Sequence, residues 1–133
     1  MTLEILGPRA CRRLLQEVPV GWLAHCTDGV VHLRPVNFSV YEAEVVVRSG
    51  YGESLTAAAA GTVMTFGAGS FDETTRTGWS VTVVGRAHLL GDELVNPGVA
   101  PPDVWAGLDR TVAIAVPMTT VTGRRVGRPG AQE

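Results

Sequence analysis

The stretch VGWLAHCTDGVVHLRPVNFSVY, residues 20–41, follows a period of two on both sides of the dipeptide Asp28-Gly29. This period is typical of β-strands that are buried on one face. Asp-Gly between two such runs is a strong hairpin signal, because both turn positions of a tight hairpin need a positive φ. Pro35 cannot donate to a strand ladder, so it marks an edge or a bulge. The stretch predicts a β-hairpin with strands at Val20–Cys26 and Val30–Tyr41.

The rest of the chain predicts one helix followed by further strands. Apolar side chains at three- and four-residue spacing, with Pro8 near the start, predict a helix over Gly7–Glu17. Apolar runs predict four further strands, at Glu44–Arg48, Thr62–Phe66, Trp79–Leu90 with a bend at Gly85, and Thr111–Val116. An alanine-rich run predicts a short helix at Leu55–Ala60. We expect an exposed connection at Phe71–Gly78 and a loop over Gly91–Asp109 with a helical turn at Asp103–Leu108. Too few helices alternate with strands for a doubly wound sheet. The predicted fold class is mainly β: a six-stranded antiparallel split β-barrel with an N-terminal helix and short inserted helices.

Length and composition indicate one domain. The 133 residues are 45% hydrophobic, enough for one core, and we expect a domain over residues 1–126 with a flexible tail over 127–133. The 11 basic residues, all arginine, nearly balance the 13 acidic residues, which gives no electrostatic case for nucleic acid or an anionic membrane. Two cysteines make no disulfide framework, and no histidine pattern suggests a metal. Neither a signal peptide nor a membrane helix is evident in the sequence, so we expect a cytoplasmic protein.

The segment RSGYGESL, Arg48–Leu55, is a candidate anion site where a strand ends and a helix begins. Glycines let the backbone approach a ligand, and a helix N-terminus presents unpaired N–H groups. An ordinary strand-to-helix turn explains the same residues, and Glu53 favours that alternative because a carboxylate already satisfies the helix dipole.

Two other segments have residues suited to a flat ligand. In RPVNF, Arg34–Phe38, Pro35 interrupts the ladder beside the amide of Asn37, although an edge strand with an outward Asn is the simpler interpretation. In GWSV, Gly78–Val81, Trp79 offers a face for stacking but is more often a core residue. No serine has a nucleophile-elbow context and no carboxylate pair suggests glycoside chemistry, so any catalysis would depend on a cofactor.

The order of these segments resembles the pyridoxamine 5'-phosphate oxidase-like, FMN-binding split-barrel family in its short actinobacterial form. The resemblance depends on CRRLLQEVPVGWLA, RPVNF, EVVVRSGYGESL, TGWSVTVVGRA and VTGRRV, and covers Pro8–Val126. It implies a homodimer with two flavin sites between the subunits. FMN is the usual cofactor of similar proteins, and some relatives use a deazaflavin or haem.

The resemblance also implies which residues bind the cofactor. Those that it places around the flavin are Arg34, Pro35, Val36 and Asn37 along the ring, Arg48, Ser49, Ser54 and Leu55 near the ribityl-phosphate arm, and Trp79 and Ser80 from a neighbouring strand. Similar sequences carry Ser/Thr-Lys before the Leu of the loop, whereas this chain has Glu53-Ser54. Because this chain has the anionic Glu53 and lacks the lysine, we expect it to bind a phosphate more weakly than similar sequences do.

Three hypotheses for the function follow. The first is an FMN-binding oxidoreductase that acts on an unknown small-molecule substrate at the homodimer interface. The second is a cofactor-free split-barrel protein that serves as a binding protein or in a biosynthetic step. The third is a deazaflavin-dependent reductase. Oxidation of pyridoxamine phosphate itself is not expected, because only Arg124 and Arg125 represent the basic C-terminal region of the true oxidases.

Overall fold

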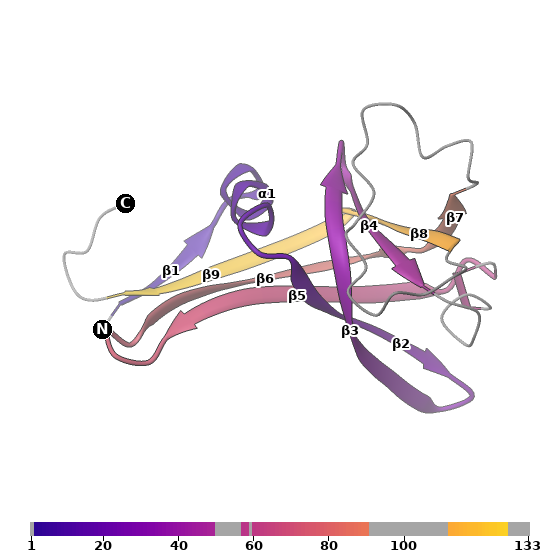
Figure 1. The fold of residues 1–133 in the computed structure, drawn as a ribbon, viewed down its shortest axis with the longest axis horizontal. Helices are drawn as coiled ribbons and strands as arrows, with labels where there is room; N and C mark the ends of the chain where they lie inside the picture. Colours follow the sequence, from indigo (N-terminus) through magenta and orange to yellow (C-terminus); the bar gives the residue numbers. More distant parts are fainter. Residues whose placement is uncertain (1, 50–56, 59, 91–111, 128–133) are drawn as a thin grey trace.

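The computed structural model describes residues 2–49, 57–58, 60–90 and 112–127. Within these residues the chain forms one sheet of nine antiparallel strands and one helix (Figure 1). The elements are β1 (Thr2–Leu6), α1 (Pro8–Leu15), β2 (Val20–Thr27), β3 (Val30–Tyr41), β4 (Glu44–Ser49), β5 (Val63–Asp72), β6 (Thr77–Arg86), β7 (His88–Leu90), β8 (Val112–Pro117) and β9 (Thr120–Gly127). Their spatial order is β1-β9-β6-β5-β2-β3-β4-β8-β7.

The hairpin that dominates the sequence pattern is confirmed. Thr27 pairs with Val30, and the two turn residues have φ of 51° at Asp28 and 76° at Gly29, the positive values of a primed turn. The strand β3 pairs with β2 as far as Asn37 and with β4 from Phe38 onward. It therefore joins the long strands to the shorter ones and lets the sheet curl into a split barrel.

The predicted fold class is confirmed, but the predicted number of strands is wrong. The sequence predicts six strands, and β1 and β9 pair in a region where none was expected. Half of the predicted connection Phe71–Gly78 is also strand, because β5 continues to Asp72 and β6 begins at Thr77. Glycine and serine in GAGS hide the period of β5, so its pairing with β6 decides the structure there.

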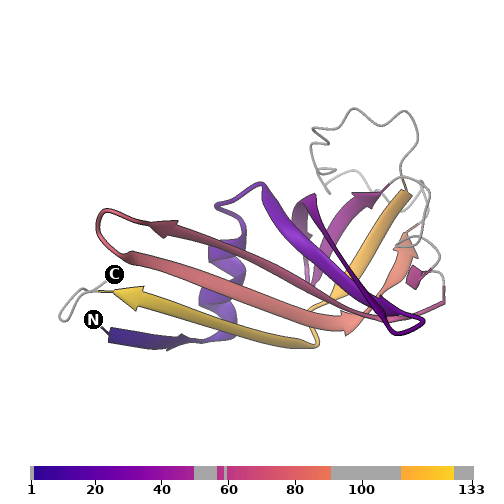
Figure 2. The same ribbon diagram turned by 90° about the horizontal axis from the view of Figure 1, so that it is seen from below.

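A core fills one face of the long strands. The helix α1 buries Cys11, Leu14 and Leu15 against this face, which we call the inner face (Figure 2). Phe38 and Phe66 pack ring to ring with centroids 4.6 Å apart. The inner face also holds Leu23, Trp79, Val81 and Val83.

The strands predicted at Glu44–Arg48 and Thr111–Val116 are confirmed as β4 and β8, with bounds that differ by one residue. The predicted strand Trp79–Leu90 is two strands, β6 and β7, that break at Ala87. The predicted helix at 55–60, the loop at 91–109 and the tail beyond 127 lie largely or wholly outside the described residues. No helix in the described ranges is long and apolar enough to cross a membrane.

Candidate functional site

The face of the long strands opposite α1, which we call the outer face, gathers three of the candidate residues. Directly paired residues of antiparallel strands project from the same face. Pro35 pairs with Trp22, Trp22 pairs with Gly67, and Gly67 pairs with Thr82. This row crosses from β3 to β6. The next row along holds Asn37, paired with Val20, and Ser80, paired with Gly69.

Two glycines leave a flat strip across this face. Gly67 and Gly69 carry no side chain, and a Cβ on Gly69 would lie 2.6 Å from the backbone oxygen of Trp79. Such a close approach excludes any larger residue at Gly69 without a shift of the backbone. The strip is bordered by Ser80 and Thr82 on one side, and β2 separates it from Pro35 and Asn37 on the other. The Phe71 ring borders the Gly69 end of the strip, where its Cε2 atom would lie 3.3 Å from a Cβ on Gly69. A planar ring system can lie against the strip beside Phe71, because neither glycine carries a side chain.

The strand β3 supplies hydrogen-bonding groups at the edge of the outer face. Residues with even numbers between Val30 and Val36 bond to β2, because Thr27 and Val30 close the hairpin. The carbonyl groups of Leu33 and Pro35 therefore point away from β2, where no described strand pairs with Val30–Val36. The side-chain amide of Asn37 donates to the Pro19 oxygen at 3.3 Å, which fixes its position. These polar groups lie at the free edge of β3, with β2 between them and the glycine strip, and can accept hydrogen bonds from the edge of a heteroaromatic ligand there.

The other two candidates on β3 project to the opposite side. Val36 is packed against the core. Arg34 pairs with Leu23 and is exposed, two residues from His32, whose ring stacks on that of His25 at 4.9 Å. Their contribution to a ligand on the outer face would come from the backbone.

Arg48 and Ser49 lie in the other part of the sheet. They close β4, where Arg48 pairs with Ala113 and Ser49 with Val112. Arg48 is half-buried. The loop that carries Glu53, Ser54 and Leu55 lies outside the described residues, so the proposed anion site stays a prediction.

Trp79 and Ser80 are neighbours in β6 and therefore project from opposite faces. Trp79 is 8% exposed and belongs to the core cluster, beside α1. Ser80 lies on the outer face. A single planar ligand on the outer face can touch Ser80 of that protomer but not its Trp79 indole, and the predicted contact with Trp79 stays a prediction.

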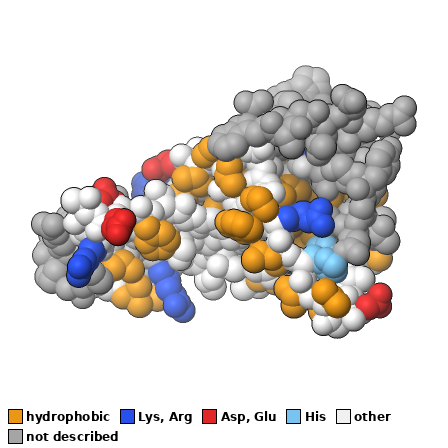
Figure 3. Space-filling model, turned by 60° about the horizontal axis from the view of Figure 1, so that its bottom comes forward, with side chains coloured by type: hydrophobic (Ala, Val, Ile, Leu, Met, Phe, Trp, Pro, Cys, Tyr) orange, Lys and Arg blue, Asp and Glu red, His pale blue; other side chains and the backbone are white. Residues whose placement is uncertain are grey.

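An apolar surface around the glycine strip is not evident from the sequence pattern. Large apolar side chains on the outer face remain exposed, including Trp22 at 49%, Leu33 at 62% and Phe71 at 68%. The others on this face are Leu3, Ile5, Val31 and Val63. Figure 3 shows hydrophobic side chains in several clusters on this side of the molecule. We call these seven residues the apolar outer patch. Its signal was hidden because β1 and the second half of β5 were not recognised as strands.

Side chains for conventional catalysis are sparse in the described part of the chain. No group of three His, Cys, Asp or Glu side chains could hold a metal ion within the described ranges. Cys11 lies on the buried side of α1, and burial raises the pKa of its thiol, so it is a poor nucleophile. Cys26 is exposed on the outer face.

Comparisons with known proteins identify the family of this chain. A family model described as pyridoxamine 5'-phosphate oxidase matches residues 8–125. The FAD binding protein from Mycobacterium smegmatis is 30% identical to this chain, with a TM-score of 0.72, and the match covers 94% of this chain and 99% of that protein.

Two further relatives extend the comparison. The uncharacterized protein Rv0080 from Mycobacterium tuberculosis is 28% identical over 127 residues, which cover 86% of this chain and 79% of that protein. An FAD-binding protein from Mesorhizobium loti shares the fold with a TM-score of 0.79 at 21% identity, over 96% of this chain and 99% of that protein.

Proposed function

This chain belongs to the pyridoxamine 5'-phosphate oxidase family, and on that basis we propose that it binds a flavin on its outer face and acts as a flavin-dependent oxidoreductase. A bound flavin supplies hydride or electron exchange through its ring. The chain itself would bind and orient the ring between Asn37 and Ser80 and exclude water from it. The substrate is a small molecule that reaches the exposed side of the ring.

The flat glycine strip is the observation that supports this proposal most strongly. Only a residue without a Cβ fits at Gly69, where the backbone of Trp79 approaches closely. The strip lies between polar groups of two strands that are far apart in the sequence. The FAD binding protein from Mycobacterium smegmatis, at 30% identity, supports a flavin as the planar ligand.

We also propose that the chain forms a homodimer in which two copies cover one another, and the apolar outer patch supports this. Exposed apolar clusters that gather on one face of a monomer are typical of an interaction site. A dimer with two-fold symmetry would bury the same patch from both copies. The flavin would then lie between the subunits, and the substrate would reach the part of the ring that the partner leaves exposed.

Replacement of Leu33 by Asp should make the protein monomeric at micromolar concentration. The new carboxylate would be desolvated in the proposed interface, while in the monomer it remains in water. Val30→Asp is the matched control, because Val30 is an exposed residue of the same hairpin whose side chain projects from the opposite face. Sedimentation velocity distinguishes the species. A monomeric wild-type protein, or a Leu33→Asp variant that remains dimeric, would contradict the interface.

The cofactor is tested by titration of the purified protein with FMN, FAD and a deazaflavin in parallel, followed by calorimetry. We expect a flavin to bind in the micromolar range or tighter, with FMN as the ligand predicted from the family resemblance. Absence of binding of all three at high micromolar ligand would reject the flavin proposal.

A cofactor-free protein is the second candidate, because Glu53 and Ser54 stand where similar sequences carry a phosphate-binding pair. Under this alternative, the double substitution Glu53→Ser with Ser54→Lys would create flavin binding that the wild-type protein lacks. Tight binding by the wild-type protein would reject it.

A further inference from the structure

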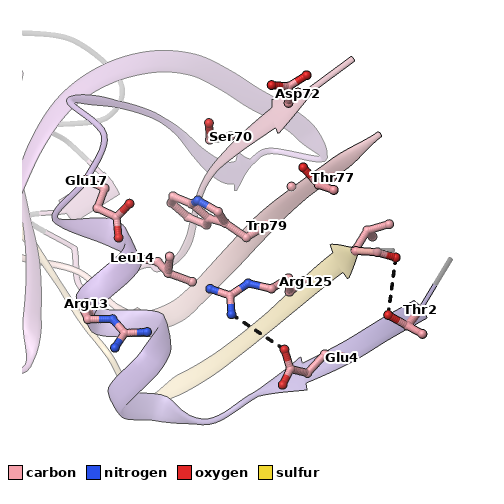
Figure 4. A pocket seen from close by; sticks show the side chains of 13 residues that line it. Thr2, Glu4, Arg13, Leu14, Glu17, Ser70, Asp72, Thr77, Trp79 and Arg125 are labelled. Atoms are coloured by element: carbon pink, nitrogen blue, oxygen red, sulfur yellow. Dashed lines mark hydrogen bonds and ion pairs between the residues drawn. The ribbon is translucent and has the colours of Figure 1, made fainter. Parts of the chain in front are cut away.

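A second pocket lies on the inner face, on the opposite side of the sheet from the proposed flavin. It has a volume of roughly 530 Å³ and opens between the C-terminal end of α1 and the ends of β1, β5, β6 and β9. Trp79 forms part of its floor, with Leu14 beside it (Figure 4). Because Trp79 and Ser80 project from opposite faces of β6, a ligand here cannot be the ligand of the outer face.

Charged groups line this inner pocket in two places. The guanidinium groups of Arg13 and Arg125 lie on the same side, and the Glu17 carboxylate lies on the other side, near the Trp79 indole (Figure 4). The positive charge of Arg125 is partly offset by the Glu4 carboxylate, which lies 3.8 Å from its guanidinium group. The pocket therefore carries two arginines and three carboxylates, of which Glu4 lies beside Arg125, while Glu17 and Asp72 lie apart from the arginine side.

Three of these groups lack a partner among the described residues. Arg13, Glu17 and the indole N–H of Trp79 make no hydrogen bond or ion pair there. Arg13 and Glu17 are four positions apart, and the chain turns after Leu15, so both side chains reach the pocket. The Trp79 side chain is nearly buried, so its ring position is fixed before a ligand arrives.

The chemistry of this lining selects a particular kind of ligand. A free carboxylate is the natural partner of two guanidinium groups, which bind it through charge-assisted hydrogen bonds. An ammonium group is favoured beside both a carboxylate and an indole, since the indole face attracts cations. A purely anionic ligand would meet Glu17 and Asp72, and a purely cationic ligand would meet Arg13 and Arg125. A molecule with both charges satisfies both sides.

We propose that the inner pocket binds a small zwitterion of the amino-acid type, with its carboxylate between Arg13 and Arg125 and its ammonium group beside Glu17 and Trp79. The proposal is independent of the flavin, because it uses the opposite face of the sheet. It predicts a site that remains intact in protein without cofactor.

The test uses ω-amino acids of increasing length as probes, namely glycine, β-alanine, 4-aminobutyrate and 6-aminohexanoate, with butylamine and butyrate as probes that carry one charge. Binding is followed by NMR through the indole N–H signal of Trp79, which is assigned by its loss in Trp79→Phe. We expect at least one ω-amino acid to shift this signal and to bind at least ten-fold more tightly than either singly charged probe.

Variants of Arg13, in α1, and of Glu17, just after it, then test the two ends of the site. Arg13→Ala and Glu17→Gln should each weaken the best probe by about ten-fold, while Arg9→Ala, an exposed arginine of the same helix that does not line the pocket, should have no effect. Three outcomes would overturn the proposal: no probe shifts the Trp79 signal at millimolar concentration, butylamine or butyrate binds as well as the best ω-amino acid, or Arg13→Ala and Glu17→Gln leave its affinity unchanged.

Discussion

A Ser80→Arg variant is expected to lose at least 100-fold in flavin affinity, which corresponds to about 2.7 kcal/mol. Ser80 lies on the outer face, next to the strip formed by Gly67 and Gly69. A long side chain at this position would cover the strip and occupy the volume of the ring. The change projects away from the core, so the fold should be preserved. Calorimetric titration with the flavin that binds the wild-type protein provides the measurement.

Two controls make this prediction specific. Ser80→Ala should retain affinity within a few-fold, because it leaves the strip open. Thr122→Arg introduces the same charge on the same face, but one strand further from the strip, on β9. If Ser80→Arg bound flavin as well as the wild-type protein, the strip could not be the site of the ring.

The largest expected effect on stability follows replacement of Gly85 by Val. Gly85 is buried in β6 where the long strands approach the end of β8, and a Cβ there would collide with the backbone oxygen of Pro117. The Cβ is fixed to the backbone of β6, and the Pro117 oxygen belongs to the backbone of β8, so neither atom can rotate away. We expect a loss of about 3 kcal/mol or more in the free energy of unfolding, measured by urea denaturation.

Gly67→Ala is the matched control for Gly85→Val. Gly67 is also a strand glycine, but the nearest atom to its added Cβ is the Val81 oxygen at an ordinary 3.8 Å. Its unfolding free energy should change by less than about 1 kcal/mol, because Ala lowers the entropy of the unfolded chain. Equal stability losses in both variants would show that the close contact at Gly85 is not the cause.

The sequence predicted the fold class well because its strongest signals are local. Asp28-Gly29 determines a tight turn, and the period of two around it determines which side chains are buried. Thr2–Leu6 and Thr120–Gly127 carry no comparable local signal. They become strands by pairing with each other and with β6. Such pairing joins residues far apart in the chain, so the residues of either segment alone do not predict it.

The candidate site was partly predictable for the same reason. Asn37 and Ser80 were selected through the family resemblance, and the strand register places both on one face. Gly67 and Gly69, which separate them, were not selected, because a glycine in a weak strand pattern is read as loop. The same resemblance places Trp79 at the flavin beside Ser80, whereas the alternation of β6 directs its indole to the inner pocket.

The most direct test of the account is sedimentation velocity of the flavin-loaded protein, recorded at the visible absorbance band of the flavin. The account predicts that this absorbance sediments with a dimer, at one flavin per protomer, and that Leu33→Asp abolishes both the dimer and the bound flavin. Visible absorbance that stays with the slowly sedimenting free flavin, or that moves with a monomer, would contradict it.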